Sequence, residues 1–278
     1  MNKKKAQMPI IRWILIIGVL LFSIAPILFV FLSSFKIPNE IFEFPPRLFF
    51  KPTLKNYIDL HSYFPEFFVS IKNSLYVTIL TILLTLLVSV PAAYVYSRYK
   101  SNKLINLSSF NLLVTRMFPP IVVSIPLFTA FNVLNINDTP YVLIILYSTF
   151  LVSLTTLIIK AFIDGIPVEL EEAARIDGAT RSQVIWKIIF PLSAHGVIAS
   201  SVFIIVFSWN EFTFAYILAG CRTRTAPVMI NEMLGAVMGV QWGMLLAATT
   251  IQFIPILFFV FLFQRYLMMG INIGGVKG

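Results

Sequence analysis

Long apolar runs separated by short polar stretches make up most of this sequence. A helix needs about 20 mainly apolar residues to cross the roughly 30 Å hydrocarbon core of a bilayer. Six runs reach that length, and they cover approximately residues 13–34, 73–97, 105–131, 141–162, 192–219 and 242–263. The pattern therefore predicts an all-α membrane protein with six transmembrane helices.

The first and third runs are the least regular. Lys3, Lys4 and Lys5 precede the first run, as in a signal peptide. However, this run is too long for the apolar part of a signal peptide and no small-residue cleavage site follows it, so we expect a retained span. Proline within a spanning helix frees carbonyl groups that other groups must satisfy. One charge and three prolines interrupt the third run, namely Arg116, Pro119, Pro120 and Pro126.

Composition supports a membrane location. Hydrophobic residues make up 58% of the chain and charged residues only 12%, whereas soluble domains average about a quarter charged residues. The net charge of +9 could suggest binding to nucleic acid. The basic residues lie in short stretches between the apolar runs, as in loops that face an anionic cytoplasmic leaflet. We therefore expect contact with membrane lipid and no nucleic-acid partner.

The distribution of lysine and arginine predicts the orientation in the cell membrane. If the N-terminus is inside, internal segments carry thirteen basic residues and external segments carry seven. Because basic residues concentrate in cytoplasmic loops, both termini are expected to be cytoplasmic. The expected organisation is an N-terminal helix with a long external loop (1–72), a transmembrane core (73–266) and a C-terminal cytoplasmic tail (267–278).

Few residues of this chain suit catalysis or cofactor binding. Cys221 is the single cysteine, and His61 and His195 have no neighbours at metal-ligand spacing. The sequence has no Gly-rich phosphate loop of the GxxxxGK[ST] type. We therefore expect no metal and no cofactor in this chain. A membrane enzyme would need catalytic groups at membrane depth, but every aspartate lies in a loop or at the end of a run.

The cytoplasmic segment 166–191 predicts two short helices. Pro167 fits the first helical position, and acidic residues favour the positive end of the helix dipole in the opening turns. These acids are Glu169, Glu171 and Glu172. The first helix is expected to end at Asp177 and Gly178, because glycine readily takes the left-handed conformation that closes a helix.

A second, amphipathic helix is expected to follow. Thr180 and Gln183 have the spacing of a capping box. An apolar stripe then leads to Pro191, which opens the fifth span. The stripe consists of Val184, Ile185, Ile188 and Ile189.

Two interpretations of this helix pair are open. It could rest on the lipid surface, but such helices carry lysine and arginine on the polar face. The first helix instead has four acids and only Arg175. Acidic side chains suit a basic groove on a protein partner, so docking is favoured. A passive channel would not need such a docking helix.

The same segment resembles the EAA signature of importer permeases in the ATP-binding cassette superfamily. The signature is Glu-Ala-Ala, three residues, Gly, nine residues, then Ile-x-Leu-Pro. Glu172, Gly178 and Pro191 match its spacing, with Phe190 where Leu is usual. Other motifs resemble the smaller subunit of carbohydrate permeases of the maltose type. They are Pro91-Ala-Ala-Tyr94 with Arg98, Asp138-Thr139, Trp209-Asn-Glu-Phe212 and the ending Gly270-Ile-Asn-Ile-Gly-Gly-Val-Lys-Gly278.

This resemblance implies an ATP-driven importer of a sugar, polyol or glycerol-phosphate-type solute. The expected partners are a second permease subunit, either a different chain or a second copy, two cytoplasmic subunits that hold ATP and Mg, and an extracytoplasmic solute-binding protein. The implied ATPase-coupling residues are Glu171, Glu172, Ala173, Ala174, Asp177 and Gly178. The implied tail at the ATPase interface is Gly274, Gly275, Val276 and Lys277. In the external loop 220–241, the binding-protein candidates are Arg222, Thr223, Arg224 and Asn231.

Two charged residues, Arg116 and Glu211, lie inside predicted spans. A lone charge there costs about 2.5–3.5 kcal/mol on insertion scales, so each must be shielded from lipid. One interpretation, which the sequence slightly favours, is a mutual ion pair between the third and fifth helices. The other is that both line the solute path with Trp209 and Asn210, since aromatic and amide groups suit a sugar.

Overall fold

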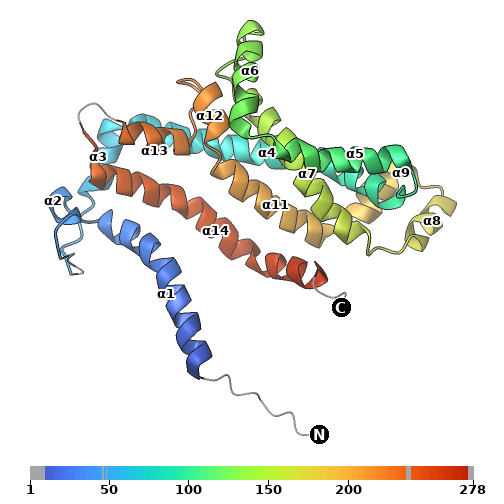
Figure 1. Cartoon of the computed structure of the whole chain (residues 1–278), viewed down its shortest axis with the longest axis horizontal. Coiled ribbons are helices and arrows are strands. Elements are labelled where there is room, and N and C mark those ends of the chain that lie inside the picture. The colour runs from blue at the N-terminus through green and yellow to red at the C-terminus, as the bar shows by residue number, and fades with distance from the viewer. Residues whose placement is uncertain (1–9, 46, 48, 236–238, 275–278) are drawn as a thin grey trace. The chain divides into compact units, whose positions relative to one another are not determined.

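The computed structural model describes residues 10–45, 47, 49–235 and 239–274, and every regular element in these ranges is helical (Figure 1). The long helices are α1 (Ile10–Ser33), α4 (Pro65–Arg98), α7 (Pro140–Ile163) and α14 (Trp242–Gly274). The shorter elements are α2 (Pro38–Ile41), α3 (Lys55–Tyr63), α5 (Lys103–Val114), the 3-10 helix η1 (Thr115–Met117), α6 (Pro120–Val133), α8 (Glu169–Ile176), α9 (Arg181–Gln183), the π-helix η2 (Val184–Ile189), α10 (Phe190–Leu192), α11 (Ala194–Trp209), α12 (Thr213–Leu218) and α13 (Ala226–Leu234).

The predicted all-helical membrane fold is confirmed, but only four spans are continuous helices. By length and composition, α1, α4, α7 and α14 can each cross a membrane. The other two candidates are bent pairs, with 91° between Lys103–Met117 and Pro120–Val133 and 80° between Arg181–Leu192 and Ala194–Trp209. The chain therefore has four to six candidate spans.

Local chemistry explains the break in the third run. Phe118 and Pro119 both have extended backbone, with ψ of 122° and 133°. Each precedes a proline, and the residue before a proline is driven out of the α region by steric clash. The fifth run is also interrupted, because α11 ends at Trp209 and α12 starts only at Thr213. The predicted spans 105–131 and 192–219 are therefore interrupted helices, and each can be a span only as a broken one.

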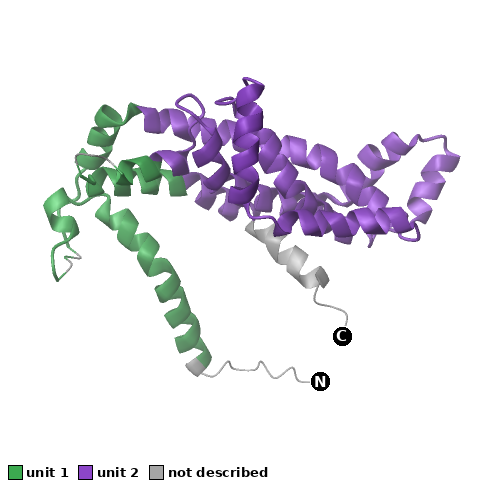
Figure 2. Ribbon diagram, turned by 45° about the horizontal axis from the view of Figure 1, so that its top comes forward, with its two compact units in different colours: residues 1–65, 230–253 green, residues 66–229, 254–278 purple. Residues whose placement is uncertain are grey.

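The chain forms two compact units (Figure 2). Unit 1 consists of residues 1–65 and 230–253. A buried side chain, Asn56, organises part of it, since its amide donates to the carbonyls of Ser34 and Lys36, each at 2.7 Å. The buried Lys36 ammonium lies 5.1 Å from the ring centroid of Phe50. A cation over an aromatic face is favourable when it is removed from water.

Unit 2 consists of residues 66–229 and 254–278, and its core follows α4 and α7. Two apolar clusters lie toward opposite ends of these helices. The first joins α4 and α7 to α12 and Val228, and the second joins them to η2 and α11. The stripe predicted after Thr180 is confirmed, since Val184 and Ile189 are fully buried in the second cluster and Ile185 and Ile188 pack against it.

One face of α4 consists of buried hydroxyl residues. They are Ser70, Ser74, Thr78, Thr81, Thr85, Ser89 and Ser97, each 4% exposed or less. Small residues let helices approach closely in a membrane, where hydroxyls also bond across the interface. The hydroxyls of Thr78 and Ser208 lie 3.3 Å apart, and that of Ser89 donates to the Val152 carbonyl. This face therefore positions α7 and α11 against α4.

Candidate functional site

Helix α8 ends as the sequence predicted. Gly178 has φ of +87°, and its N–H donates to the Arg175 carbonyl while the Ala179 N–H donates to that of Ala174. These two hydrogen bonds form the Schellman motif, which satisfies carbonyls left free at a helix end. The start differs slightly from the prediction, because Val168 caps the helix and Pro167 precedes the cap.

The predicted capping box at Thr180 and Gln183 is also confirmed. The Thr180 hydroxyl accepts from the Gln183 backbone N–H, and the side-chain oxygen Oε1 of Gln183 accepts from the Thr180 backbone N–H. The sequence did not predict the π-helix η2 that follows. Its wider turn brings residues five positions apart onto one face, which explains how Val184 and Ile189 are both fully buried.

The two neighbouring glutamates of α8 have different environments. Glu171 is 4% exposed; its Oε1 accepts from Arg98 Nε at 2.6 Å and its Oε2 from the Tyr94 hydroxyl at 2.8 Å. Arg98 Nη2 also donates to the Ile166 carbonyl. Glu172 is exposed. Of these two candidates for ATPase contact, only Glu172 therefore lies on the free surface of the helix.

The other candidates on this segment are mostly exposed. Ala173, Asp177 and Gly178 are exposed, while Ala174 packs against the second apolar cluster. Ile176 is 86% exposed, so the outer surface of α8 combines acids with a large apolar side chain. Of the predicted C-terminal tail, Gly274 ends α14. Gly275, Val276 and Lys277 lie outside the described residues.

Beside α8, Asp164 joins the end of α7 to the end of α4. Its carboxylate accepts from Ser97 Oγ at 2.6 Å, from Lys160 Nζ at 2.8 Å and from Lys100 Nζ at 3.1 Å. Burial alone would raise the pKa of Asp164, but these donors outweigh it and lower the pKa. The carboxylate is therefore ionised at neutral pH.

A cavity of about 470 Å³ lies within unit 2, where both broken runs meet α7. Three of the four solute-path candidates, Arg116, Asn210 and Glu211, line it. Trp209 instead is 1% exposed and lies outside the lining. Aromatic residues also line the cavity, namely Tyr147, Phe150, Phe207, Phe212 and Phe214.

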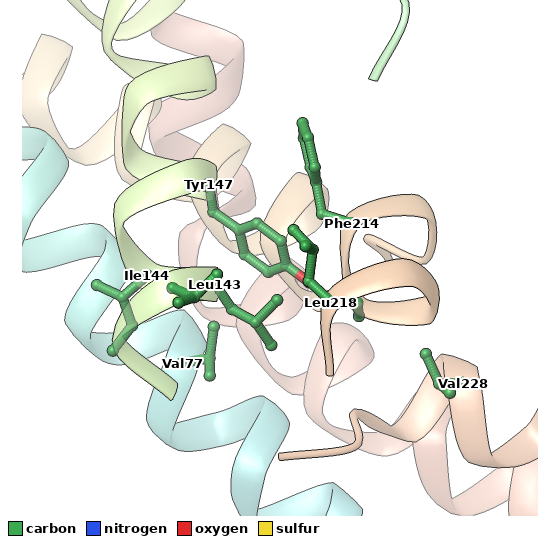
Figure 3. Packing of buried hydrophobic residues seen from close by; sticks show 9 residues of the cluster. Val77, Leu143, Ile144, Tyr147, Phe214, Leu218 and Val228 are labelled. Carbon is green, nitrogen blue, oxygen red and sulfur yellow. The ribbon is translucent and has the colours of Figure 1, made fainter. Parts of the chain in front are cut away.

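Tyr147 was not identified from the sequence. It is 2% exposed, and its hydroxyl lies near the Glu211 carboxylate without a hydrogen bond of ordinary geometry to any described residue. Figure 3 shows its ring extending from α7 toward α12, which carries Phe214 and Leu218. The sequence does not mark this tyrosine within an apolar run as a cavity residue, because the cavity forms only when distant elements meet.

Glu211 caps a helix, and it forms no ion pair with Arg116 among the described residues. Its Oε1 accepts from the Phe214 N–H at 2.9 Å and its Oε2 from the Ala215 N–H at 3.2 Å. These N–H groups belong to the first turn of α12, where negative charge is favourable. The break after Trp209 creates this helix start, so the carboxylate bonds to the backbone rather than to the guanidinium.

We expect Glu211→Gln and Arg116→Met to act independently on stability. Glutamine has one acceptor oxygen, so Glu211→Gln should cost about 1 kcal/mol through the weakened cap. The cost should be the same in the wild-type background and in the Arg116→Met background, within about 0.5 kcal/mol. Thermal unfolding of the two single variants and the double variant measures this. A coupling free energy of about 2 kcal/mol or more between the two substitutions would instead show that Arg116 and Glu211 interact as an ion pair.

Just before the start of α7, Asp138 accepts hydrogen bonds from the α12–α13 loop (residues 219–225). Its carboxylate accepts from the N–H groups of Gly220, Arg222 and Thr223 at 2.9, 3.2 and 3.0 Å, and from the Thr223 hydroxyl at 2.7 Å. Of the binding-protein candidates, Thr223 is therefore part of this buried anchor. Arg222 and Asn231 are exposed, and Arg224 is partly buried. Asn231 lies on α13, a helix within the predicted external loop that the sequence did not predict.

The anchor should weaken in acid. Burial alone would raise the pKa of Asp138, but the hydrogen bonds from Thr223, Arg222 and Gly220 hold it below its ordinary value of 3.8. A carboxyl group with a lowered pKa stabilises the fold above its ordinary value and loses this contribution as the pH falls through the folded value.

The test compares the thermal unfolding midpoints of wild type and Asp138→Asn from pH 7 to pH 3. At neutral pH the variant should have a lower unfolding midpoint than wild type. Its free energy of unfolding should be about 1 kcal/mol smaller, because asparagine is uncharged and has one acceptor oxygen. The two proteins should converge below about pH 4. A difference that stays constant down to pH 3 would show that the charge of Asp138 has no part in the anchor.

Residues 85–272 match the family described as binding-protein-dependent transport system inner membrane component. The chain belongs to this family. It is 33% identical over 277 residues to the trehalose/maltose transport system permease protein MalG of Thermococcus litoralis, covering 96% of this chain and 97% of that one. It is 32% identical over 265 residues to the inner membrane ABC transporter permease protein YcjP of Escherichia coli (strain K12), covering 93% of each.

The fold of this permease also matches a solved structure. A chain from a bacterial ABC transporter involved in the import of the acidic polysaccharide alginate aligns with a TM-score of 0.76 over 96% of this chain and 98% of that one, at 19% identity. The permease is thus a multi-pass transport subunit of the plasma membrane in a binding-protein-dependent importer. The resemblance seen in the sequence motifs is confirmed. In the part of the chain that the structure describes, no group of three His, Cys, Asp or Glu could hold a metal ion.

Proposed function

We propose that this permease imports an uncharged sugar, polyol or oligosaccharide and that ATP hydrolysis on partner subunits drives it through α8. The observation that carries this proposal is the surface of α8. Glu172 and the apolar Ile176 are exposed on this short helix, and Asp177 is exposed at its C-cap. Glu171 fixes that helix to the bundle. An exposed helix surface that combines acidic and apolar side chains, and that is held firmly to the rest of the permease, suits a basic groove on another protein.

The proposed assembly contains a second permease chain, two ATP-binding subunits that hold ATP and Mg, and an extracytoplasmic binding protein. Six spans then place both termini and α8 on the cytoplasmic side, with the C-terminal tail reaching the ATPases. Arg222 on the α12–α13 loop and Asn231 on α13 are both exposed, and we assign them to contact with the binding protein. The distribution of lysine and arginine supports this orientation.

The cavity supports an uncharged solute. It contains one cation, Arg116, and one anion, Glu211, so its formal charge is balanced. Aromatic faces and the exposed Asn210 amide offer stacking surface and a hydrogen-bonding group, the combination that typical ligand pockets use. The MalG relative is named for trehalose and maltose transport, which agrees with this class.

The experiment is to purify the intact complex from the host and to identify the subunits that copurify. ATP hydrolysis in proteoliposomes is then measured with the binding protein and a panel of uncharged and acidic oligosaccharides. Stimulation by uncharged sugars, with two ATPase copies per complex, is the expected result. Stimulation only by acidic sugars would overturn the solute class, and a complex without an ATPase would overturn the coupling proposal.

A further inference from the structure

Helix α4 is hydrogen-bonded to α8 at one end. Arg98 and Tyr94 of α4 take up both carboxylate oxygens of Glu171, and Arg98 also donates to the carbonyl of Ile166 just before α8. The side chains of Arg98 and Glu171 are only 12% and 5% exposed. An ion pair shielded from water in this way is held firmly, because separation would leave a buried charge without a partner. A displacement of α8 must therefore move the end of α4 with it.

At its other end, α4 is hydrogen-bonded to the α12–α13 loop. Asn73 Nδ2 donates to the carbonyls of Arg222 and Arg224 at 2.9 and 3.0 Å. The Ser74 hydroxyl accepts from the Ala226 N–H at 2.8 Å. Two of these bonds fix the backbone of the loop at Arg222 and Arg224, and the third fixes the first residue of α13.

The helix between these anchors is continuous. From Asn73 to Arg98 it advances about 38 Å at 1.5 Å per residue, which exceeds the hydrocarbon thickness of a bilayer. The two bent pairs break by 91° and 80° and cannot transmit a push along one axis. Helix α7 is also continuous, but the hydrogen bonds near its start that hold the loop come from Asp138, which precedes its first residue.

We propose that α4 is the rigid element that couples α8 to the α12–α13 loop, and that Arg98, Glu171 and Asn73 are its positioning residues. Binding of the solute-loaded binding protein at the loop shifts α4, and α4 moves α8 against the ATPase. The inference rests on the proposed function, since it requires an ATPase at α8 and a binding protein at the loop. It assigns Glu171 a role inside the permease, distinct from the outward contact of Glu172.

The test uses the reconstituted complex and measures ATP hydrolysis with and without the solute-loaded binding protein. Glu171→Gln keeps the shape of the side chain and removes its charge. We expect the ATPase to copurify, because Glu172 and Ile176 remain on the exposed surface of α8, and stimulation is expressed as the ratio of the rates with and without the binding protein. Stimulation by the binding protein should fall about 2- to 30-fold, the range of coupling energies for residues between two sites. Tyr94→Phe, which removes a single hydrogen bond, should give a smaller loss of the same kind.

The loop end is tested with Asn73→Ala, and Lys72→Ala is its matched control. Lys72 is exposed on the neighbouring position of α4. Asn73→Ala should lose stimulation at an unchanged basal rate, whereas Lys72→Ala should behave as wild type. Because both anchors act through one helix, the double variant Asn73→Ala with Glu171→Gln should be no worse than the more affected single variant.

Three results would overturn the role of α4. They are full stimulation in Glu171→Gln, parallel loss of basal rate and bound ATPase in that variant, and additive losses in the double variant. Parallel loss would mean that Glu171 only holds α8 in place. A wild-type complex that the binding protein does not stimulate would instead remove the proposed function itself, together with the inference based on it.

Discussion

A complex that carries Glu172→Lys should keep its normal level in the membrane and lose solute-stimulated ATP hydrolysis by at least about tenfold. Glu172 is exposed and makes no ion pair within the described chain, so its replacement leaves the fold of the permease intact. At a contact with a basic groove, reversal of the charge costs several kcal/mol, and every 1.4 kcal/mol is about tenfold in affinity. The readouts are the amount of permease in membranes and the hydrolysis rate in proteoliposomes.

Glu66→Lys is the matched control for that variant. Glu66 is an exposed carboxylate in the first turn of α4, at the end remote from Arg98. It should leave hydrolysis unchanged. Wild-type transport by Glu172→Lys with its ATPase still bound would show that this residue has no part in coupling.

Gly178→Val should cause the same loss through the backbone. Space is not the obstacle, because a Cβ at this position would meet nothing within 4 Å. The obstacle is φ of +87°, since a residue with a Cβ pays roughly 1–2 kcal/mol in the left-handed region and a β-branched one more. The turn would open and α8 would point in another direction. Gly178→Asn, which tolerates this conformation, should retain more stimulation than the valine variant.

Gly220→Ala should release the α12–α13 loop. A Cβ there would lie 2.6 Å from both Cγ and Oδ2 of Asp138. The carboxylate cannot move away without loss of the hydrogen bonds from Arg222 and Thr223. A lost hydrogen bond to a charged group costs about 1.5–3 kcal/mol, which raises the open population of the loop more than about tenfold.

Trypsin cleavage after Arg222 and Arg224 measures this opening directly. The rate should rise at least about tenfold in Gly220→Ala, and stimulation by the binding protein should fall with it. Gly235→Ala is the control, because its nearest atom would be at an ordinary 3.7 Å. Equal cleavage rates in the two variants would mean that Asp138 does not restrain the loop.

Local rules predicted the parts of this molecule that depend on neighbours in sequence. The left-handed Gly178 and the capping box of Thr180 and Gln183 each follow from a few consecutive residues. Apolar runs likewise located α1, α4, α7 and α14, since length and composition decide whether a helix can cross a bilayer.

Contacts between distant segments could not be predicted in the same way. Glu171 and Glu172 are adjacent acids with the same sequence signal, and only the position of Arg98 on another helix separates their roles. The sequence placed Arg116 and Glu211 at membrane depth and favoured a pair. The break after Trp209 created a new helix start that takes up the carboxylate instead. A helix break inside an apolar run depends on packing against other elements, which hydropathy does not record.

The same anchored loop carries the single cysteine of the chain. Cys221 is exposed, and Arg224 Nη2 lies 3.5 Å from its sulfur. An impermeant thiol reagent added to one face of a sealed vesicle would therefore react at one known position, without any engineered residue. A fluorophore attached there would sit between two of the N–H groups that Asp138 binds. The permease thus carries a natural attachment point for optical measurements on the loop that the binding protein is proposed to reach.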